Sequence, residues 1–371
     1  MSNYKEELTI ILTLKDRVSF SYRWMEYMND LRCPYKILIA DGGIDKEIEI
    51  QLNNINNYPY LDYSYIRYPV DKTLSDFYRK FVSVINLVKT PYLLFADNDD
   101  FFLLDKIPEF INFLNQNSDY TACGGSNVHL SLLSETNLIV NSTSSENYIA
   151  TCTDINRSVE NSTGIERIEY FMKFADTHDL WSCWYQVQRT SSIVRAFNFL
   201  NRYHFIDLVA YEIHIHLQLL NIGKYKELKT PFYIRQAGTS QMTSEANVGT
   251  NLVERFVKNN AFEELHKSIN SIIPDLLIDE KDRIYRAIAS WFIHHGSGIY
   301  MVEPEITLRV LIKQCIMLFF SYLRSFFWPL RIYYHAINRR FKFKVGSKNG
   351  SYQSMKLGEI EKYILNKYFK G

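Results

Sequence analysis

The amino-acid sequence predicts an α/β protein whose core is an open, mostly parallel sheet. Along residues 8–96, short apolar runs rich in β-branched residues alternate with amphipathic stretches of helical spacing. The chain of 371 residues is 47% hydrophobic and 22% charged, which is enough to bury a sizeable core. This length exceeds one ordinary domain, so we expect one large domain with an appendage.

Four strands and three helices are expected in alternation at the start of the chain. Apolar runs predict strands at residues 8–14, 35–40, 61–68 and 92–96. The intervening helices are predicted at residues 19–28, 45–55 and 74–88. Asp16 or Ser19 could cap the first of them. Because such connections are right-handed, the carboxyl ends of the strands should lie along one edge of the sheet, where ligands bind.

Three aspartates, Asp97, Asp99 and Asp100, directly follow the fourth apolar run. Carboxylates this close repel one another unless a cation lies between them. Oxygen-only ligands suit a hard divalent metal, Mg²⁺ or Mn²⁺, which commonly brings substrate phosphates with it. A solvated acidic turn that caps the next helix is the alternative.

Two other predicted strand ends carry polar residues. Asp41 follows the second strand and precedes Gly42 and Gly43, an arrangement that brings backbone close to a ligand and can hold a ribose hydroxyl. A tight turn between strand and helix explains the same residues. The first strand ends in the polar residues 15–17. Convergence of three polar strand ends on one edge favours a binding site there.

The composition argues against several classes of protein. A formal net charge of +1 argues against nucleic-acid binding, so no nucleic-acid partner is expected. The five cysteines are scattered without a C-x-x-C pair, which is typical of reduced thiols in a cytoplasmic protein. The polar start of the sequence lacks the apolar segment of a signal peptide.

The order of the strand ends resembles the nucleotide-sugar domain of GT-A-fold glycosyltransferases of the family 2 type. The ends read T-L-K-D-R, A-D-G-G and F-A-D-N-D-D, the last containing a DXD motif. The resemblance covers residues 6–245 and implies a Rossmann-like sheet. It also implies that Thr13, Arg17 and Asp41 bind the base and ribose of a nucleotide sugar.

In the same family, the DXD motif binds ribose and a metal on the diphosphate. Those roles fall on Asp97 and Asp99, with Mg²⁺ or Mn²⁺ as the implied cofactor. Asp100 resembles the extra acid of such motifs. Downstream, residues 230–240 resemble the last strand and loop of the family, where an arginine approaches the diphosphate. Arg235 takes that place.

A helix is predicted over residues 205–222, ended by Gly223. In the family, the catalytic acid lies eleven residues before this glycine, and here that residue is Glu212. Its implied role is the base that takes the proton of the acceptor hydroxyl. A surface glutamate paired with a lysine is the alternative. Asp207 and Asp179 are the other candidates for the base.

The predicted helix also carries His214 and His216. Residues two apart on a helix point to different faces, so at least one histidine is predicted to be a packing or surface residue. Gln236 stands near the position where many relatives use a metal-binding histidine. The third metal ligand therefore stays open.

The middle of the chain is less regular. It predicts helices at residues 107–116 and 167–175, and a short strand at 120–125. The Ser-, Thr- and Asn-rich residues 126–163 predict either an antiparallel β excursion or a mobile flap. Residues 176–189 predict either a sugar-stacking wall or an aromatic core strand that contains Trp184 and Tyr185.

The C-terminal third differs in composition from the rest. Residues 246–304 predict a helical extension packed on the catalytic domain. In residues 305–371, basic residues recur among Phe, Trp and Leu, with no acidic residue between Glu305 and Glu359. No apolar run is long enough to span a bilayer, and the pattern is typical of helices in an anionic membrane interface. A dimer helix, or a core helix with snorkelling arginines, is the alternative.

These residues and the resemblance predict a glycosyltransferase with a GT-A domain at residues 1–245. It would be metal-dependent and inverting, and would transfer a sugar from a nucleotide-sugar donor to a glycan or polyprenyl-linked acceptor in surface-polysaccharide synthesis. Its C-terminal helices would hold it on the inner face of the cytoplasmic membrane. A sugar nucleotidyltransferase is one alternative, but the turn at residues 13–17 lacks the expected glycines. A non-catalytic, membrane-bound nucleotide- or glycan-binding module is the other.

Overall fold

The computed structural model describes residues 6–132, 148–153, 158–173, 184–200, 205–236, 261–272, 278–297 and 352–354. The strands are β1 (Leu8–Leu14), β2 (Lys36–Asp41), β3 (Tyr63–Arg67), β4 (Tyr92–Ala96), β5 (Phe101–Phe102), β6 (Tyr120–Leu132), β7 (Tyr148–Thr153), β8 (Val187–Arg189), β9 (Lys224–Gln236) and β10 (Tyr352–Ser354). The α-helices are α1 (Val18–Asp30), α2 (Glu47–Asn53), α3 (Leu74–Ile85), α4 (Ile107–Gln116), α5 (Gly164–Lys173), α6 (Thr190–Leu200), α7 (Leu208–Ile222), α10 (Ala261–Ile272) and α11 (Ile278–Ser297). Short 3-10 helices lie at Ile55–Asn57 and Leu104–Lys106.

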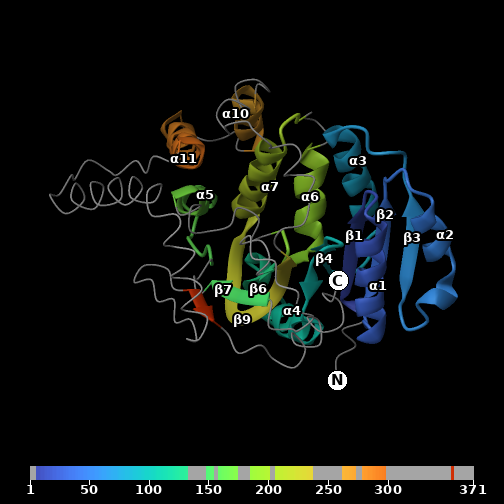
Figure 1. Cartoon of the computed structure of the whole chain (residues 1–371). Coiled ribbons are helices and arrows are strands. Elements are labelled where there is room, and N and C mark those ends of the chain that lie inside the picture. Colours follow the sequence, from blue (N-terminus) through green and yellow to red (C-terminus); the bar gives the residue numbers. More distant parts are fainter. Residues whose placement is uncertain are drawn as a thin grey trace, which may run out of the picture.

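Within the described segments, ten strands form one sheet in the order β10-β7-β6-β8-β4-β1-β2-β3, and β9 pairs with β5 and β6. Strands β1 to β4 pair in parallel, as do β6 and β9. Antiparallel pairs join β8 to β4 and β6, and β7 to β6 and β10. Figure 1 shows the sheet from β7 on the left to β3 on the right. The prediction of a mostly parallel sheet therefore holds for residues 8–96 and is wrong for the whole sheet, which is mixed.

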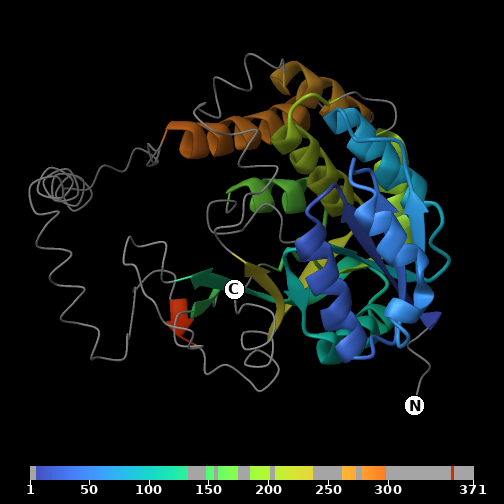
Figure 2. The same cartoon turned by 45° about the vertical axis from the view of Figure 1, so that its right-hand side comes forward.

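Helices cover both faces of the sheet, as Figures 1 and 2 show. On one face, α3, α5, α6 and α7 share a core with Ile11 of β1 and Phe95 of β4. On the other face, α1, α2 and α4 share a core with the neighbouring residues Ile10 and Leu94. Because successive side chains of a strand point to opposite faces, both faces must be apolar. This double burial explains why β1, β2 and β4 read as unbroken apolar runs.

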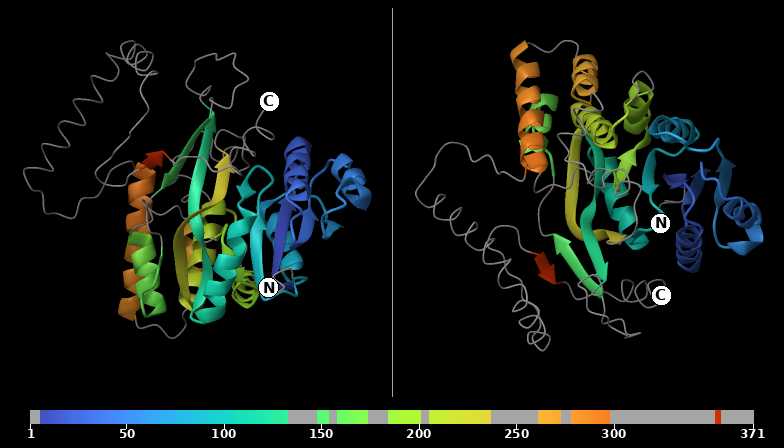
Figure 3. Two further views of the ribbon diagram at one scale, coloured as in Figure 1. Left: turned by 90° about the horizontal axis from the view of Figure 1, so that it is seen from below. Right: turned by 45° about the horizontal axis from the view of Figure 1, so that its top comes forward.

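Helices α10 and α11 pack on this domain. Leu265 of α10 and Ile284 of α11 belong to the same core as α5 and α7. Figure 3 shows α11, in orange, beside α5, in green. The described part of residues 246–304 thus consists of these two helices, and the predicted domain boundary at residue 245 lies outside the described residues.

The predicted membrane-associating segment, residues 305–371, also lies outside the described residues apart from β10. Among the helices that the structure describes, none is both long enough and apolar enough to cross a membrane.

The turn between β1 and α1 differs from the predicted one. Arg17 occupies the position before the helix, and no side chain caps it, so Ser19 and Asp16 are not the cap. Asp16 and Arg17 both have positive φ, at 57° and 59°. The Asp16 carboxylate accepts hydrogen bonds from the backbone N–H groups of Ile44 and Asp45, at 2.6 and 3.0 Å. It therefore fixes this left-handed turn to the neighbouring turn after β2.

The second half of the chain settles one open alternative and confirms one predicted helix end. β6 continues to Leu132 and pairs with β7 in antiparallel, so the described parts of residues 126–163 form the β excursion. α7 ends at Ile222, as predicted from Gly223. A Cβ atom on Gly223 would lie 2.8 Å from the carbonyl oxygen of Asp119, which explains the glycine at this turn. Helix α6 is not among the predicted elements.

Candidate nucleotide-sugar site

Three parallel strands end at the same edge of the sheet. Leu14 of β1 is in register with Asp41 of β2, and Leu12 of β1 is in register with Ala96 of β4. Asp97 follows Ala96 directly. The predicted convergence of the polar strand ends is therefore confirmed.

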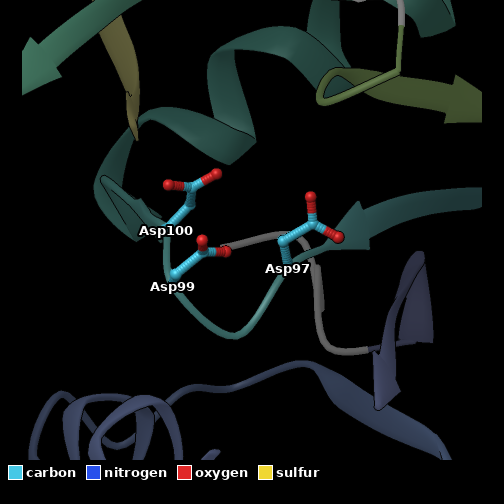
Figure 4. A group of neighbouring side chains, drawn as sticks. All are labelled: Asp97, Asp99 and Asp100. Carbon is cyan, nitrogen blue, oxygen red and sulfur yellow. The ribbon is translucent and has the colours of Figure 1, made fainter. Parts of the chain in front are cut away.

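Asp97, Asp99 and Asp100 form a compact cluster of carboxylates after β4, referred to below as the acidic cluster. One carboxylate oxygen from each lies within 4.8 Å of the others, and Figure 4 shows the side chains on the same side of the turn. Asp99 and Asp100 are only 4% and 2% exposed, and Asp97 is partly exposed. Burial of this kind does not fit the alternative of a solvated acidic turn.

Two stacked tyrosines bind Asp97 and Asp100, the first and last residues of the acidic cluster. Tyr185, just before β8, donates a hydrogen bond to Asp97 Oδ2 at 2.5 Å, and Tyr233 of β9 donates one to Asp100. The ring centroids of the tyrosines lie 4.2 Å apart at an interplanar angle of 8°. The backbone N–H of Gln236 donates to the other oxygen of Asp100, at 2.8 Å. Because both oxygens of Asp100 accept hydrogen bonds, Asp97 and Asp99 are better placed to hold a metal.

Burial makes the acidic cluster electrostatically costly. Burial, followed by the charge of Asp99, raises the pKa of Asp97 to about 6. Burial and the charges of the other two carboxylates raise the pKa of Asp100 well above its usual range. Arg235 lowers both pKa values by its charge. A further cation at the cluster would favour the ionised carboxylates in the same way.

Arginines approach the acidic cluster from the turn before α1, from α1 itself and from β9. Both terminal nitrogens of Arg17 lie 3.1 Å from Asp99 Oδ2. Arg23 donates to the backbone carbonyl of Asp99 at 3.3 Å and to Gln236 Oε1 at 2.8 Å. Arg235, on β9, lowers the pKa of Asp97 and of Asp100 by its charge. Arg17 thus contacts a predicted metal ligand, whereas the resemblance implies a contact with base or ribose.

Asp41 is fully buried beneath the turn that follows β2. Its carboxylate accepts hydrogen bonds from the N–H of Gly43 at 2.8 Å, from the Tyr65 hydroxyl at 2.6 Å and from Arg67 at 2.5 Å. Arg67 also donates to the carbonyl oxygen of Asp45, at 3.2 Å. These contacts order the turn, and the predicted ribose contact of Asp41 stays a prediction.

Thr13 lies near the end of β1, with 9% of its surface exposed. Behind it, Lys80 of α3 donates to the carbonyl oxygen of Leu14 at 2.9 Å and forms an ion pair with Asp71. Both charged side chains are almost completely buried. This pair anchors the start of the turn that carries Arg17.

Glu212 lies in the second turn of α7 and is partly exposed. Burial raises the pKa of Tyr78 in α3 and of Tyr211, and the charge of Glu212 adds to both shifts. Glu212 therefore lies where α7 meets α3, and its catalytic role stays a prediction. Asp207 accepts a hydrogen bond from the N–H of Ala210 at 3.3 Å, so it stabilises the start of α7. Asp179 lies outside the described residues.

Both histidines of α7 are packing residues, as predicted for at least one of them. His214 contacts Ser268 of α10, and burial lowers its pKa to about 3. The ring of His216 stacks on Phe171 of α5, with centroids 5.4 Å apart. Neither belongs to a metal site among the residues that the structure describes.

Trp184 and Tyr185 divide between the core and the site. Trp184 stacks on Phe95 with ring centroids 4.8 Å apart, so the predicted core role is confirmed for this residue. Tyr185 instead binds Asp97. Sequence reasoning missed Tyr233 and Arg23 as site residues, and it expected Tyr185 only in a sugar-stacking wall or a core strand. The only sequence signal for the role of Tyr185 is that it directly follows Trp184, because neighbouring side chains of an extended chain can point to opposite sides.

The acidic cluster is chemically suited to a hard divalent cation. It offers oxygen ligands alone, within 4.8 Å of one another, and two of the three carboxylates are buried. Mg²⁺ and Mn²⁺ prefer such ligands. Asp97 and Asp99 would hold the ion.

No family model matches the chain, and no curated protein matches its sequence. Its structure is similar to TarS 1–349 of S. aureus in complex with UDP-GlcNAc, at 12% identity and a TM-score of 0.48, covering 82% of this chain and 77% of that chain. It is also similar to the mannosyltransferase PcManGT from Pyrobaculum calidifontis in complex with GDP-Man and Mn²⁺, at 10% identity and a TM-score of 0.44, covering 87% and 83%. These structures are too distant to assign a function to this chain.

Proposed function

We propose that this protein is a metal-dependent glycosyltransferase that uses a nucleotide-sugar donor. The observation that supports this most is the meeting of the acidic cluster with Arg17 and Arg235 at the ends of parallel strands. Carboxylates alone suit a bare cation, and guanidinium groups alone suit an anion. Both together suit a divalent metal bound to a diphosphate.

Each residue would have a distinct task in sugar transfer. Asp97 and Asp99 would hold Mg²⁺ or Mn²⁺, which when bound stabilises negative charge on the leaving diphosphate. Arg235 would donate hydrogen bonds to the same diphosphate. Thr13 and Asp41 would position the base and ribose.

Glu212 would take the proton of the acceptor hydroxyl. The acceptor oxygen then forms a bond to the anomeric carbon while the bond from that carbon to the diphosphate breaks, which inverts the configuration. The acceptor would be a glycan or a polyprenyl-linked saccharide of surface-polysaccharide synthesis. This last assignment rests on the sequence resemblance.

Calorimetric titration with UDP, GDP, CDP, dTDP and CMP, each with and without Mn²⁺, tests the proposal. We expect metal-dependent binding of one nucleotide and a loss of about tenfold or more in affinity in Asp99→Asn. Asp119→Asn, which removes a carboxylate that is 56% exposed, is the matched control. A metal-independent preference for CMP would contradict the metal role of Asp97 and Asp99. Binding of no nucleotide would contradict the proposed function.

We also propose that residues 305–371 attach the protein to the inner face of the cytoplasmic membrane. The support is the sequence, with its basic and aromatic residues and no acidic residue between Glu305 and Glu359. The test is sedimentation of the full chain with phosphatidylglycerol or phosphatidylcholine vesicles. We expect binding to the anionic vesicles only, weakened about tenfold or more by Arg339→Glu/Arg340→Glu. Equal binding of wild type and the Arg339→Glu/Arg340→Glu variant to the anionic vesicles would contradict attachment by this segment.

A further inference from the structure

We infer that Arg17 is an exchangeable counter-ion: it pairs with Asp99 in the free protein and moves to the diphosphate when the donor binds. This exchange would make the binding of metal and of nucleotide cooperative. The inference rests on the proposed function, and it assigns to Arg17 a role at the metal and diphosphate rather than at the base.

The contact between Arg17 and Asp99 is an incomplete pairing. Both terminal nitrogens of the guanidinium lie 3.1 Å from the same oxygen, Asp99 Oδ2, instead of one on each carboxylate oxygen. The Nε atom of Arg17 is buried and makes no hydrogen bond among the described residues. A guanidinium normally binds an oxyanion through two parallel hydrogen bonds. A phosphate could accept hydrogen bonds from Nε and a terminal nitrogen together.

The surroundings of Arg17 allow its side chain to move while its backbone stays in place. Asp16 is fixed to the neighbouring turn by two backbone N–H groups, at 2.6 and 3.0 Å. The Arg17 side chain is 26% exposed, whereas that of Asp99 is 5% exposed. The guanidinium lies over the ring of Phe20, 4.2 Å from its centroid. An aromatic face supports a guanidinium by attraction without fixing its hydrogen bonds.

The exchange follows from charge balance. A divalent cation bound by Asp99 would be repelled by a guanidinium on the same carboxylate oxygen. A diphosphate would offer Arg17 another anionic partner and free the carboxylate for the metal. Arg23 cannot replace it in this exchange with the contacts described, because it donates to the backbone carbonyl of Asp99 and to Gln236. Because coupling between two ligands is reciprocal, metal and nucleotide would each strengthen the binding of the other.

Removing Arg17 should therefore raise the affinity for the metal ion and lower the affinity for the nucleotide. Calorimetric titration with MnCl₂ alone should show about tenfold tighter binding to Arg17→Met than to wild type, a change within the usual range of coupling between sites. The nucleoside diphosphate that binds wild type should bind Arg17→Met more weakly, and saturating Mn²⁺ should improve its affinity less than in wild type.

The matched control is Arg79→Met, which removes the same charge from a side chain that is 68% exposed and paired with Asp76. It should leave the affinity for Mn²⁺ within about twofold of wild type, because exposed charges are screened by solvent. If Arg17→Met does not fold, Arg17→Gln gives the same comparison. Thermal unfolding of each variant checks the fold.

Two results would overturn the inference. If wild type binds a nucleotide with metal but Arg17→Met binds Mn²⁺ alone no more tightly than wild type does, the counter-ion role is wrong and the proposed function stands. If wild type binds no nucleotide in any condition, both are wrong.

Discussion

Tyr185 and Tyr233 stack face to face, with ring centroids 4.2 Å apart, and their hydroxyl groups bind different aspartates of one cluster. The stack joins the segment before β8 to β9, two parts of the chain that are distant in sequence. Each tyrosine therefore fixes the position of the other as well as that of its carboxylate. The spacing between Asp97 and Asp100 depends on this pair.

Tyr185→Phe should weaken metal and nucleotide binding while leaving the ring stack in place. The hydrogen bond from Tyr185 lowers the pKa of Asp97, which burial and Asp99 raise to about 6. Its loss should raise that pKa further and reduce the affinity for Mn²⁺ by about tenfold, because hydrogen bonds to charged groups contribute about 1.5–3 kcal/mol. Calorimetry near neutral pH measures the change. Tyr22→Phe, at a partly exposed tyrosine bonded to Glu47, is the control, and equal affinities in the two variants would contradict the positioning role.

Lys80→Met should destabilise the protein strongly. The variant leaves the carboxylate of Asp71 buried without its cation and removes the hydrogen bond to Leu14. Breaking a buried ion pair in this way costs about 3–5 kcal/mol in the free energy of unfolding. Urea unfolding gives the value. Lys106→Met, which breaks a partly exposed pair with Asp105, should cost less than about 1 kcal/mol; a similar loss in both variants would argue against the anchoring role.

Acid should destabilise the contact between α7 and α10 through His214. Burial lowers the pKa of His214 from 6.5 to about 3. Below pH 6.5 the unfolded chain therefore binds a proton at this histidine that the folded chain does not bind. This contribution to stability is complete above pH 6.5 and is lost as the pH falls towards 3. The stability advantage of wild type over His214→Gln should shrink by about 1.4 kcal/mol per pH unit in that window.

Urea unfolding between pH 7.5 and 4.5 measures this difference. His266→Gln, at an exposed histidine stacked on Tyr285, is the control. The difference in the free energy of unfolding between wild type and this variant should change little with pH. A difference between wild type and His214→Gln that does not change with pH would show that His214 titrates normally.

Glu212→Gln should separate binding from chemistry. The variant keeps the shape of the side chain, so metal and nucleotide should bind as in wild type. Release of the nucleoside diphosphate from the donor should slow by about 10²–10⁴-fold, because a general base contributes about that factor. Glu263→Gln, at an exposed glutamate paired with Lys267, should release it at the wild-type rate. An unchanged rate in Glu212→Gln would assign the base elsewhere.

The first part of the fold could be predicted because its signals are local. Buried parallel strands require apolar residues on both faces, so β1, β2 and β4 stand out as continuous runs. Their register then brings Asp41 and Asp97 to one edge without further information. The three aspartates of the acidic cluster could be predicted for the same reason, since they are adjacent in the sequence.

The rest of the site depends on contacts between distant segments. Tyr185 reaches Asp97 and Tyr233 reaches Asp100 across 88 and 133 residues. No spacing rule connects such positions, and an aromatic residue suits a core as well as a binding site. The antiparallel part of the sheet was predicted only as one alternative for residues 126–163, because β8 has only three residues and because β6 contains two adjacent glycines, Gly124 and Gly125. The contact of Arg17 with Asp99 likewise required the left-handed turn at Asp16.

Anomalous diffraction at the manganese edge, from crystals of the protein with Mn²⁺ and the nucleoside diphosphate that calorimetry identifies, tests the central claim most directly. We predict one anomalous peak between the carboxylates of Asp97 and Asp99 and the diphosphate, with Arg17 turned from Asp99 to the phosphate oxygens. Asp99→Asn crystals grown in the same way should lose the peak. A nucleotide bound at this edge of the sheet without a manganese peak beside Asp97 and Asp99 would contradict the metal-dependent site.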